Sequence, residues 1–174
     1  MKLELASQLE ALHPDAFGWS LHCCGGDVPR AEDVLQNAYL KVVQGRAQFS
    51  GRSSLKTWWF GVIRFTAREE LRRILVRDKL HLRLLFQAVS PAPDPASPAR
   101  QLEVDEQATL LRTALNRLPQ RQAEVLHLVF YQDLSLSAAA EVLGISIGSV
   151  RQHYDRGKNR LRELLPSHET ISSS

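Results

Sequence analysis

A run of polar side chains near the C-terminus carries the chemistry that proteins use to bind DNA. Hydroxyl, amide, imidazole and cationic groups recur between residues 149 and 158. An arginine can donate two hydrogen bonds to guanine, and an amide can pair in the same way with adenine. Hydroxyl and ammonium groups contact phosphates. The side chains available for such contacts are Ser149, Arg151, Gln152, His153, Arg156 and Lys158.

Two helices joined by a tight turn would position these side chains. Ser135 and Ser146 can each cap the start of a helix, and Gly144 permits a left-handed backbone in the turn between them. Ala140 is small, so the second helix can cross the first. The expected helices cover 136–143 and 147–165, and the inward positions of the second are Val150, Tyr154, Gly157 and Leu161. This spacing favours a DNA-binding helix-turn-helix over the alternative, a helical hairpin with a solvated basic face.

The composition is that of an ordinary globular chain with unevenly distributed charge. Of the 174 residues, 44% are hydrophobic and 24% are charged, which argues against a disordered chain. The segment 1–40 is acidic, whereas 64–83 and 151–162 are basic, so we expect two kinds of partner, with nucleic acid on the basic segments. No apolar run approaches the ~18 residues of a membrane span. We therefore expect a cytoplasmic protein without membrane insertion.

A proline-rich stretch divides the chain into two helical parts. Four of the eight prolines lie within residues 90–98, and proline removes a backbone hydrogen-bond donor. The apolar residues on both sides follow helical spacing, without the alternation typical of strands. We expect an all-α fold of two small helical domains, 1–88 and 101–174, joined by a linker at 89–100. Four helices are expected in each domain.

Segments in both parts resemble bacterial extracytoplasmic-function (ECF) sigma factors. The segments that resemble their fourth region are 118–125, 134–135, 140–151 and 160–165, and those that resemble their second region are 31–36 and 53–58. The resemblance implies that the second region binds core RNA polymerase and opens the minus-ten element. It implies that the fourth region recognises the minus-thirty-five element, with Ser146 and Gly148 among its DNA contacts.

The resemblance also assigns roles in the first part. A polar loop can hold a base withdrawn from the stack, and arginines on the following helix can hold phosphates. The minus-ten candidates are Phe49, Arg52, Ser53, Ser54, Lys56, Arg64, Arg68, Arg72 and Arg73, and the polymerase-binding candidates are Glu32, Asp33, Gln36 and Asn37. For Trp58, packing in the core is the expected role. Phe65 departs from the family, which often has asparagine there, and Gly157 stands where alanine is common; glycine makes that helix less rigid.

We expect no catalytic site, no cofactor and no metal. Cys23 and Cys24 are adjacent, and no second cysteine pair completes a zinc site, so buried packing is their expected role and a regulatory thiol is the alternative. Two other functions stay open. One is a helix-turn-helix regulator that acts without polymerase, and the other is a degenerate sigma-like interaction protein. An anti-sigma factor is a further partner that the resemblance leaves open.

Overall fold

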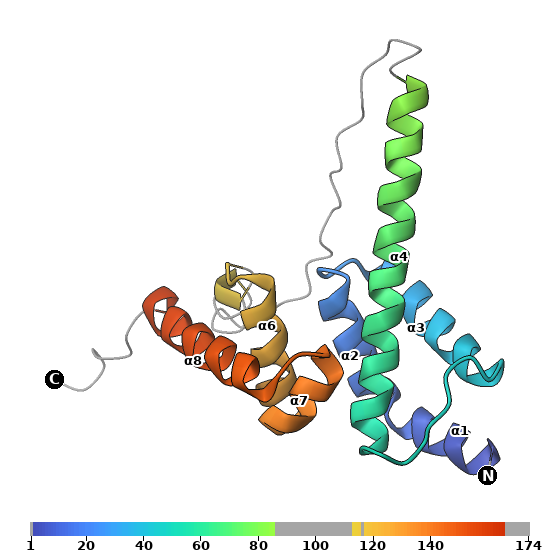
Figure 1. Cartoon of the computed structure of the whole chain (residues 1–174), viewed down its shortest axis with the longest axis horizontal. Coiled ribbons are helices and arrows are strands. Elements are labelled where there is room, and N and C mark those ends of the chain that lie inside the picture. The colour runs from blue at the N-terminus through green and yellow to red at the C-terminus, as the bar shows by residue number, and fades with distance from the viewer. Residues whose placement is uncertain (1, 86–112, 116, 166–174) are drawn as a thin grey trace, which may run out of the picture.

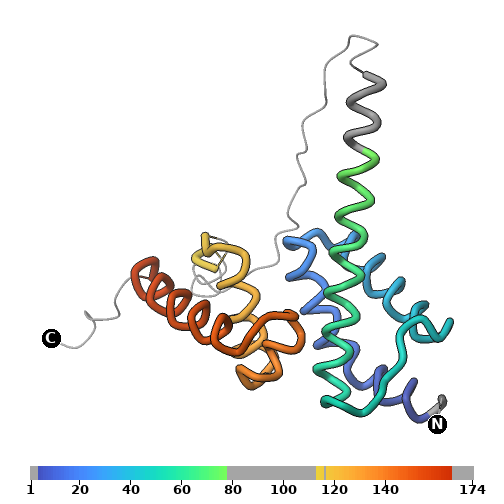
Figure 2. The backbone as a smooth tube through the Cα atoms, viewed as in Figure 1, coloured from blue at the N-terminus to red at the C-terminus, as the bar shows by residue number. Residues whose placement is uncertain are grey.

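The computed structural model describes residues 2–85, 113–115 and 117–165, and every element in these ranges is a helix (Figures 1 and 2). The elements are α1 (Lys2–Ala11), α2 (His13–Cys23), α3 (Val28–Val43), α4 (Leu55–Leu85), α6 (Gln120–Leu126), the π-helix η1 (His127–Tyr131), α7 (Leu136–Leu143) and α8 (Ile147–Leu164). The all-α prediction is confirmed for these ranges. The expected linker and most of the segment 101–118 lie outside the described residues, so the domain boundaries stay a prediction.

Side-chain caps start the helices where the sequence predicts them. The Oγ atom of Ser54 accepts a hydrogen bond from the Thr57 amide at 3.1 Å, so Ser54 caps α4. Ser135 and Ser146 cap α7 and α8 in the same way, each at 3.1 Å. Each cap satisfies one of the backbone amides that a helix start leaves without a partner.

The π-helix η1 was not expected. The apolar spacing around Val125 and Val129 predicts one helix, but its second half widens into η1. Short π-helical turns within α-helices often occur at functional sites. In η1 the rings of His127 and Tyr131 stack, with centroids 5.3 Å apart. These two aromatic rings therefore lie side by side on η1.

The two halves of the chain share one hydrophobic core. Trp19, Trp59 and Ile63 from the first half and Leu128 and Val150 from the second are completely buried in it. Helix α4 packs against α2 and α3 of the first half and against α7 of the second, and in Figure 1 α3 and α7 lie on opposite sides of it. The helix-turn-helix therefore lies directly against the helix that carries the minus-ten candidates.

Polar contacts also join the halves. The guanidinium of Arg64 on α4 and the carboxylate of Glu124 on α6 are 3.4 Å apart, with side chains only 7% and 6% exposed. The rings of His22 on α2 and His127 on η1 stack with centroids 4.4 Å apart. The Gln132 amide donates a hydrogen bond to the Asp15 carbonyl oxygen at 3.4 Å. Buried partners of this kind fix the orientation of one half against the other.

Candidate nucleic-acid interface

The helix-turn-helix has the geometry that its sequence predicts. Gly144 ends α7 in the left-handed conformation with φ of 62°, and α8 begins three residues later. Ala140 is buried and Val150 has no exposed surface, so both lie in the core between the two helices. Gly157 is also buried, and a Cβ atom there would lie 3.0 Å from Leu126 Cδ1. The glycine therefore permits close packing of α8 on α6, which corrects the expectation that it loosens the helix.

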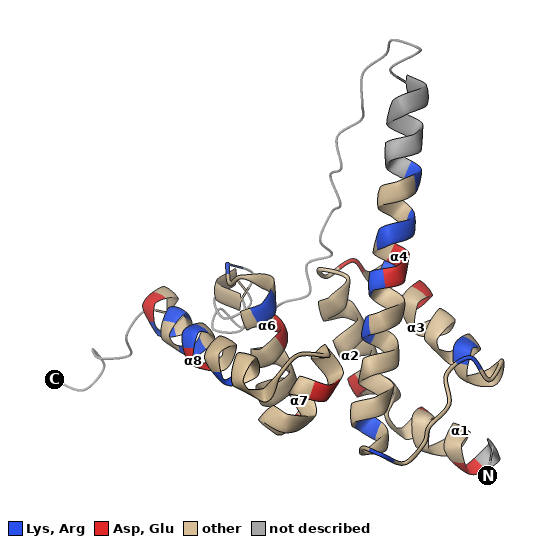
Figure 3. Cartoon of the chain, in the orientation of Figure 1, with Lys and Arg blue, Asp and Glu red and all other residues tan. Residues whose placement is uncertain are grey.

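The outer face of α8 presents most of the predicted DNA contacts. Figure 3 shows the Lys and Arg residues along this helix. Arg151, Gln152 and Arg156 are exposed, whereas His153 and Lys158 are half-buried. The Lys158 ammonium lies 5.0 Å from the centre of the Tyr154 ring. At the start of the helix Ser146 and Gly148 are exposed and Ser149 is half-buried. Positive partial charge at a capped helix start, followed by exposed cationic and amide groups, suits phosphates and base edges.

The Ser146 and Ser149 hydroxyls are already engaged with each other. Their Oγ atoms are 2.9 Å apart, and the Ser146 oxygen also accepts a hydrogen bond from the Ser149 amide. One of the two hydroxyls donates to the other, so only the one remaining hydroxyl proton can be donated to a phosphate oxygen. These serines therefore act first as structural groups of the turn.

The predicted minus-ten residues are spread over the loop before α4 and along that helix. Phe49, Arg52 and Ser54 are exposed, and Ser53 is half-buried. The Phe49 ring lies 5.3 Å from the Trp58 ring. Trp58 is half-buried and packs against the core, whereas Trp59 is completely buried within it. The tryptophan expected in the core is therefore at its edge.

The basic residues of α4 differ in what they already bind. Arg68 and Arg72 are exposed. Arg73 forms ion pairs with Glu69 at 3.0 Å and with Glu70 at 3.6 Å. Lys56, near the start of the helix, is half-buried, and its ammonium is 2.8 Å from the Asp15 carboxylate. Arg68 and Arg72 are therefore better placed for phosphates than Arg73 or Lys56.

Arg64 departs from the predicted surface contact. It is 6% exposed and pairs with Glu124 of the second half. Desolvation lowers the pKa of its guanidinium, and the Glu124 carboxylate opposes that shift. In this arrangement Arg64 holds the two halves together and does not reach the surface. The sequence pattern of arginines along α4 could not reveal this, because the partner lies sixty residues away.

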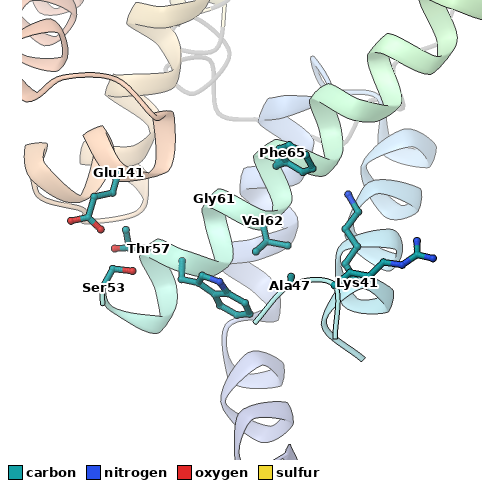
Figure 4. Close-up of a pocket in the computed structure, with 10 residues that line it drawn as sticks. Lys41, Ala47, Ser53, Thr57, Gly61, Val62, Phe65 and Glu141 are labelled. Carbon is teal, nitrogen blue, oxygen red and sulfur yellow. The ribbon is translucent and has the colours of Figure 1, made fainter. Parts of the chain in front are cut away.

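A pocket of about 380 Å³ runs beside the first turns of α4 (Figure 4). Side chains from α3, from the loop before α4, from α4 itself and from α7 surround it. Its lining residues are Lys41, Arg46, Ala47, Ser53, Thr57, Trp58, Gly61, Val62, Phe65 and Glu141. Only Ser53 among them was a predicted contact. The sequence did not reveal Lys41, near the end of α3, or Arg46, in the loop after it, because they meet α4 only in the folded chain.

Lys41 is held at this pocket by polar neighbours. Its ammonium is 2.6 Å from the Glu69 carboxylate and 3.0 Å from the Thr66 hydroxyl. The hydrogen bond from Lys41 lowers the pKa of Glu69, so the Glu69 carboxylate stays ionised. The same ammonium lies 5.0 Å from the centre of the Phe65 ring. A fixed positive charge thus sits beside an exposed aromatic ring.

The predicted polymerase-binding residues lie on the outer side of α3. Glu32, Asp33 and Gln36 are exposed, and Asn37 is half-buried. Glu32 and Gln36 border a pocket of about 470 Å³ whose other lining residues are His13, Phe17, Leu35 and Tyr39. Carboxylate and amide groups around an apolar hollow suit a protein partner better than they suit DNA phosphates.

The adjacent cysteines lie near the contact between the halves. Burial raises the pKa of the Cys23 thiol well above its usual value and raises that of Cys24 to about 11. Both thiols are therefore protonated at neutral pH, and protonated thiols react slowly. Within the described residues no three histidine, cysteine, aspartate or glutamate side chains are placed to hold a metal ion. In the same residues no helix is both long and apolar enough to span a membrane.

Comparison with known proteins identifies both halves. The Sigma-70 region 2 family matches residues 9–74, and the Sigma-70 region 4 family matches residues 114–163. The ECF RNA polymerase sigma factor EcfG of Rhodopseudomonas palustris (strain TIE-1) is 30% identical over 150 residues, which cover 86% of this chain and 77% of that protein. The probable RNA polymerase sigma factor RfaY of Xanthomonas campestris pv. campestris is 31% identical over 151 residues. The match covers 84% of this chain but only 37% of RfaY.

The fold has a close counterpart among solved structures. The sigma factor RpoE from Bartonella quintana, solved in complex with the anti-sigma factor NepR, superposes with a TM-score of 0.69 at 24% identity. The superposition covers 95% of this chain and 98% of that one. At this identity the likeness establishes the shared fold.

Proposed function

Because the chain belongs to the ECF family of RNA polymerase sigma factors, alternative sigma factors that direct transcription initiation, we propose that its two halves divide promoter recognition between them. The second half binds the minus-thirty-five element through the outer face of α8. The first half binds core polymerase and the minus-ten element. The observation that carries this proposal is the exposed row of Arg151, Gln152 and Arg156 behind the capped start of α8.

Recognition by α8 combines two kinds of contact. The helix start and the cationic side chains attract phosphates, and this part of the binding is insensitive to sequence. Gln152 and an arginine supply the donor and acceptor patterns that distinguish base pairs in the major groove. His153 and Lys158 are half-buried and lie beside this row. We expect them to contact the phosphates of the DNA backbone.

In the first half, the exposed acidic face of α3 binds core polymerase. Its candidates are Glu32, Asp33, Gln36 and Asn37. The exposed arginines of α4 hold the phosphates of the minus-ten region, with Arg68 and Arg72 as the principal contacts. The function consists of binding and of separating strands, so it uses no catalytic residue. We place it in the cytoplasm, where core polymerase and DNA are available.

An anti-sigma factor is a further partner that we propose. The Bartonella quintana sigma factor with the same fold was solved with the anti-sigma factor NepR. In this chain α4 exposes three apolar side chains, Leu71, Leu75 and Val76, which are 46%, 51% and 67% exposed. An anti-sigma factor that covers this part of α4 would compete with the binding of DNA to Arg72.

Transcription reconstituted with core polymerase tests this function. We expect the chain to direct core polymerase to promoters that are selected from a random pool by the holoenzyme. Reversal of charge at Glu32 and Asp33 should weaken binding to core polymerase without loss of helical content. Binding of DNA by the free chain with no effect on polymerase would instead indicate a helix-turn-helix regulator. Binding of a partner without either DNA or polymerase would indicate a sigma-like interaction protein.

A further inference from the structure

A pocket of about 740 Å³ lies where the two halves of the chain meet. The first half contributes residues from α2, α3 and the loop between them, and the second half contributes residues from η1, from α6 and from the segment that precedes α6. Pockets of ~300–1,000 Å³ are typical of small-molecule sites. None of the proposed DNA or polymerase contacts lines this one, which we call the interface pocket. Its lining residues include Leu21, His22, Arg30, Leu118, His127 and Tyr131.

Much of the interface pocket is apolar or aromatic. Leu21 lies on α2, and Leu118, which is 7% exposed, lies just before α6. The rings of His22 and His127 stack with centroids 4.4 Å apart, and the Tyr131 ring stacks on that of His127 at 5.3 Å. Tyr131 is nevertheless 52% exposed, so part of its ring is open to another planar group. Flat rings beside branched aliphatic groups suit a flat apolar ligand.

The charge of the interface pocket favours an anion. Burial raises the pKa of the Cys23 and Cys24 thiols, and burial lowers the pKa of His22 and lowers that of His127 to about 3. These thiols and imidazoles are therefore neutral at neutral pH. Among the described residues that line the pocket there is no aspartate or glutamate, and only Arg30 carries a charge. A ligand with one negative group is thus complementary to it.

The Arg30 guanidinium is only loosely engaged within the chain. Its Nε atom lies 3.8 Å from the Asp27 carboxylate, and the two side chains are 36% and 46% exposed. An ion pair as exposed as this contributes little to stability. The Asp27 carboxylate also accepts a hydrogen bond from the Arg30 backbone amide at 3.1 Å, so it retains a partner when the guanidinium binds elsewhere. A guanidinium can donate two parallel hydrogen bonds to one carboxylate.

We propose that the interface pocket binds a small planar aromatic carboxylate, whose carboxylate group pairs with Arg30 and whose ring packs against Tyr131 and Leu118. This inference goes beyond the proposed function and does not depend on it. The ligand touches α2 and α3 of the first half and α6 and η1 of the second. Its binding therefore stabilises the contact between the halves by an amount that grows with its concentration. The site couples this contact to the supply of a small molecule.

Titration of the full chain with 2-naphthoate, measured by calorimetry at neutral pH, tests the proposal. We expect one saturable site. The neutral analogue 2-naphthamide has the same ring, and it should bind ~10- to 150-fold more weakly, the factor that corresponds to about 1.5–3 kcal/mol for a hydrogen bond to a charged group. No saturable binding of 2-naphthoate at millimolar concentration would overturn the proposal, and so would equal affinities for the two compounds.

Arg30→Gln removes the cation from the pocket. The Asp27 carboxylate can still accept a hydrogen bond from the backbone amide of residue 30, so the start of α3 keeps its cap. The variant should bind 2-naphthoate only as tightly as the parent binds 2-naphthamide. Arg46→Gln, which removes the same charge from the loop after α3, should leave the affinity unchanged. Equal losses in both variants would show that net charge alone attracts the anion, and would overturn the site.

Tyr131→Ala tests the contact with the ring against a matched neighbour. Phe130 is 56% exposed on the same helix, but it does not line the pocket. Tyr131→Ala should weaken binding of 2-naphthoate by ~2- to 13-fold, the factor that corresponds to about 0.5–1.5 kcal/mol for one aromatic pair. Tyr131→Phe keeps the ring and should bind as the parent does. Phe130→Ala should leave the affinity unchanged, and equal losses for Phe130→Ala and Tyr131→Ala would contradict the assigned site.

A photoreactive analogue locates the ligand. An azide on the ring of 2-naphthoate labels nearby residues on illumination, and mass spectrometry identifies the labelled peptides. We expect labels in both halves, within residues 18–30 and 115–131, and excess 2-naphthoate should prevent them. Labels in one half alone, or in other segments, would overturn the proposal that the ligand contacts both halves.

Urea denaturation in the presence of 2-naphthoate measures the stabilisation of the folded chain. The midpoint should rise with ligand concentration in the parent and much less in Arg30→Gln, because that variant binds the ligand weakly. An unchanged midpoint in the parent at saturating ligand would overturn the proposal. All of these measurements use the free chain without polymerase or DNA. Their failure would therefore leave the proposed function standing, and failure of the chain to direct transcription would leave the interface pocket standing.

Discussion

At the scale of single residues, the buried pair of Arg64 and Glu124 is the most consequential contact. The Glu124 carboxylate also accepts hydrogen bonds from Arg121 at 2.9 Å and from Gln120 at 3.3 Å. Arg64 has no second acidic partner among the described residues, and its Nε atom has no hydrogen-bond partner there. Removal of Glu124 should therefore lower the free energy of unfolding more than removal of Arg64. Glu124→Ala should cost about 3–5 kcal/mol of unfolding free energy, because it leaves a buried charge unpaired.

Arg64→Met is the matched variant for this pair. It should cost less, because Glu124 retains Arg121 and the methionine side chain fills the same space. Urea denaturation of both variants at neutral pH measures the difference. Equal losses of unfolding free energy in Glu124→Ala and Arg64→Met would mean that water reaches the Arg64–Glu124 pair in solution.

Recognition of DNA bases is also decided residue by residue. Gln152→Ala or Arg156→Ala should relax the preference at one or two minus-thirty-five positions, at about 1–3 kcal/mol for each lost pair of hydrogen bonds. Ser149→Ala should weaken binding to all sequences alike, because its hydroxyl belongs to the turn through Ser146. Binding curves on promoters mutated one base pair at a time measure this. Uniform losses for Gln152→Ala and Arg156→Ala would show that these side chains contact only the DNA backbone.

At the scale of elements, two glycines in long helices have opposite roles. Gly61 in α4 faces open space, whereas Gly157 in α8 faces Leu126 and Gln122 of α6 at 3.0–3.3 Å. Leu126 is only 1% exposed, so its side chain has little room to move. Gly157→Ala should lower the free energy of unfolding by about 1–3 kcal/mol through overpacking, although alanine favours a helix. Thermal unfolding checks this, and a stabilised Gly157→Ala would show that α6 and α8 pack more loosely.

The basic end of α4 offers a second test at this scale. Arg72 is exposed, whereas Arg73 is engaged by Glu69 and Glu70. Arg72→Ala should reduce the slope of log affinity against log salt concentration by about one unit, the value for one lost phosphate contact. Arg73→Ala should change it little. The measurement is promoter binding by the holoenzyme over a range of salt concentrations. An equal change for both would mean that the ion pairs of Arg73 open when DNA binds.

At the scale of the whole molecule, stacked histidines make the contact between the halves sensitive to acid. Burial lowers the pKa of His22, and Glu124 opposes that shift. Burial and the neighbouring His22 lower the pKa of His127 to about 3. Both imidazoles are therefore neutral in the folded protein, but in the unfolded chain they bind protons near pH 6.5. Below that pH the unfolded state holds more protons, so the free energy of unfolding must fall as the pH falls.

For His127 the expected loss reaches about 1.4 kcal/mol per pH unit between pH 6.5 and its folded pKa of about 3, and His22 adds a loss of the same sign. Urea denaturation between pH 7.5 and pH 5 measures it. His127→Phe keeps an aromatic ring against Trp19 and His22 but cannot take up a proton, so its stability should depend less on pH. The same pH dependence in parent and His127→Phe would mean that other groups titrate.

Much of the fold was predictable because it depends on neighbours in the sequence. The helices follow from apolar spacing, and their starts from serines that bond an amide three residues on, as at Ser54 and Ser146. The left-handed turn at Gly144 is equally local. The exposed face of α8 follows from the same spacing, so most of the predicted base contacts do lie together on the surface.

Contacts between distant segments determined the rest, and no local pattern contains them. Arg64 is one of several arginines along α4, and it is buried beside Glu124 of α6, which it meets only in the folded chain. The pocket beside Gly61 needs Lys41 from α3 and Glu141 from α7, which meet only after folding. Helix formation is governed by interactions over three or four residues, whereas burial depends on which helices pack together. Local sequence therefore revealed the helices and the family, and long-range packing decided which of their charged side chains remain free to bind DNA.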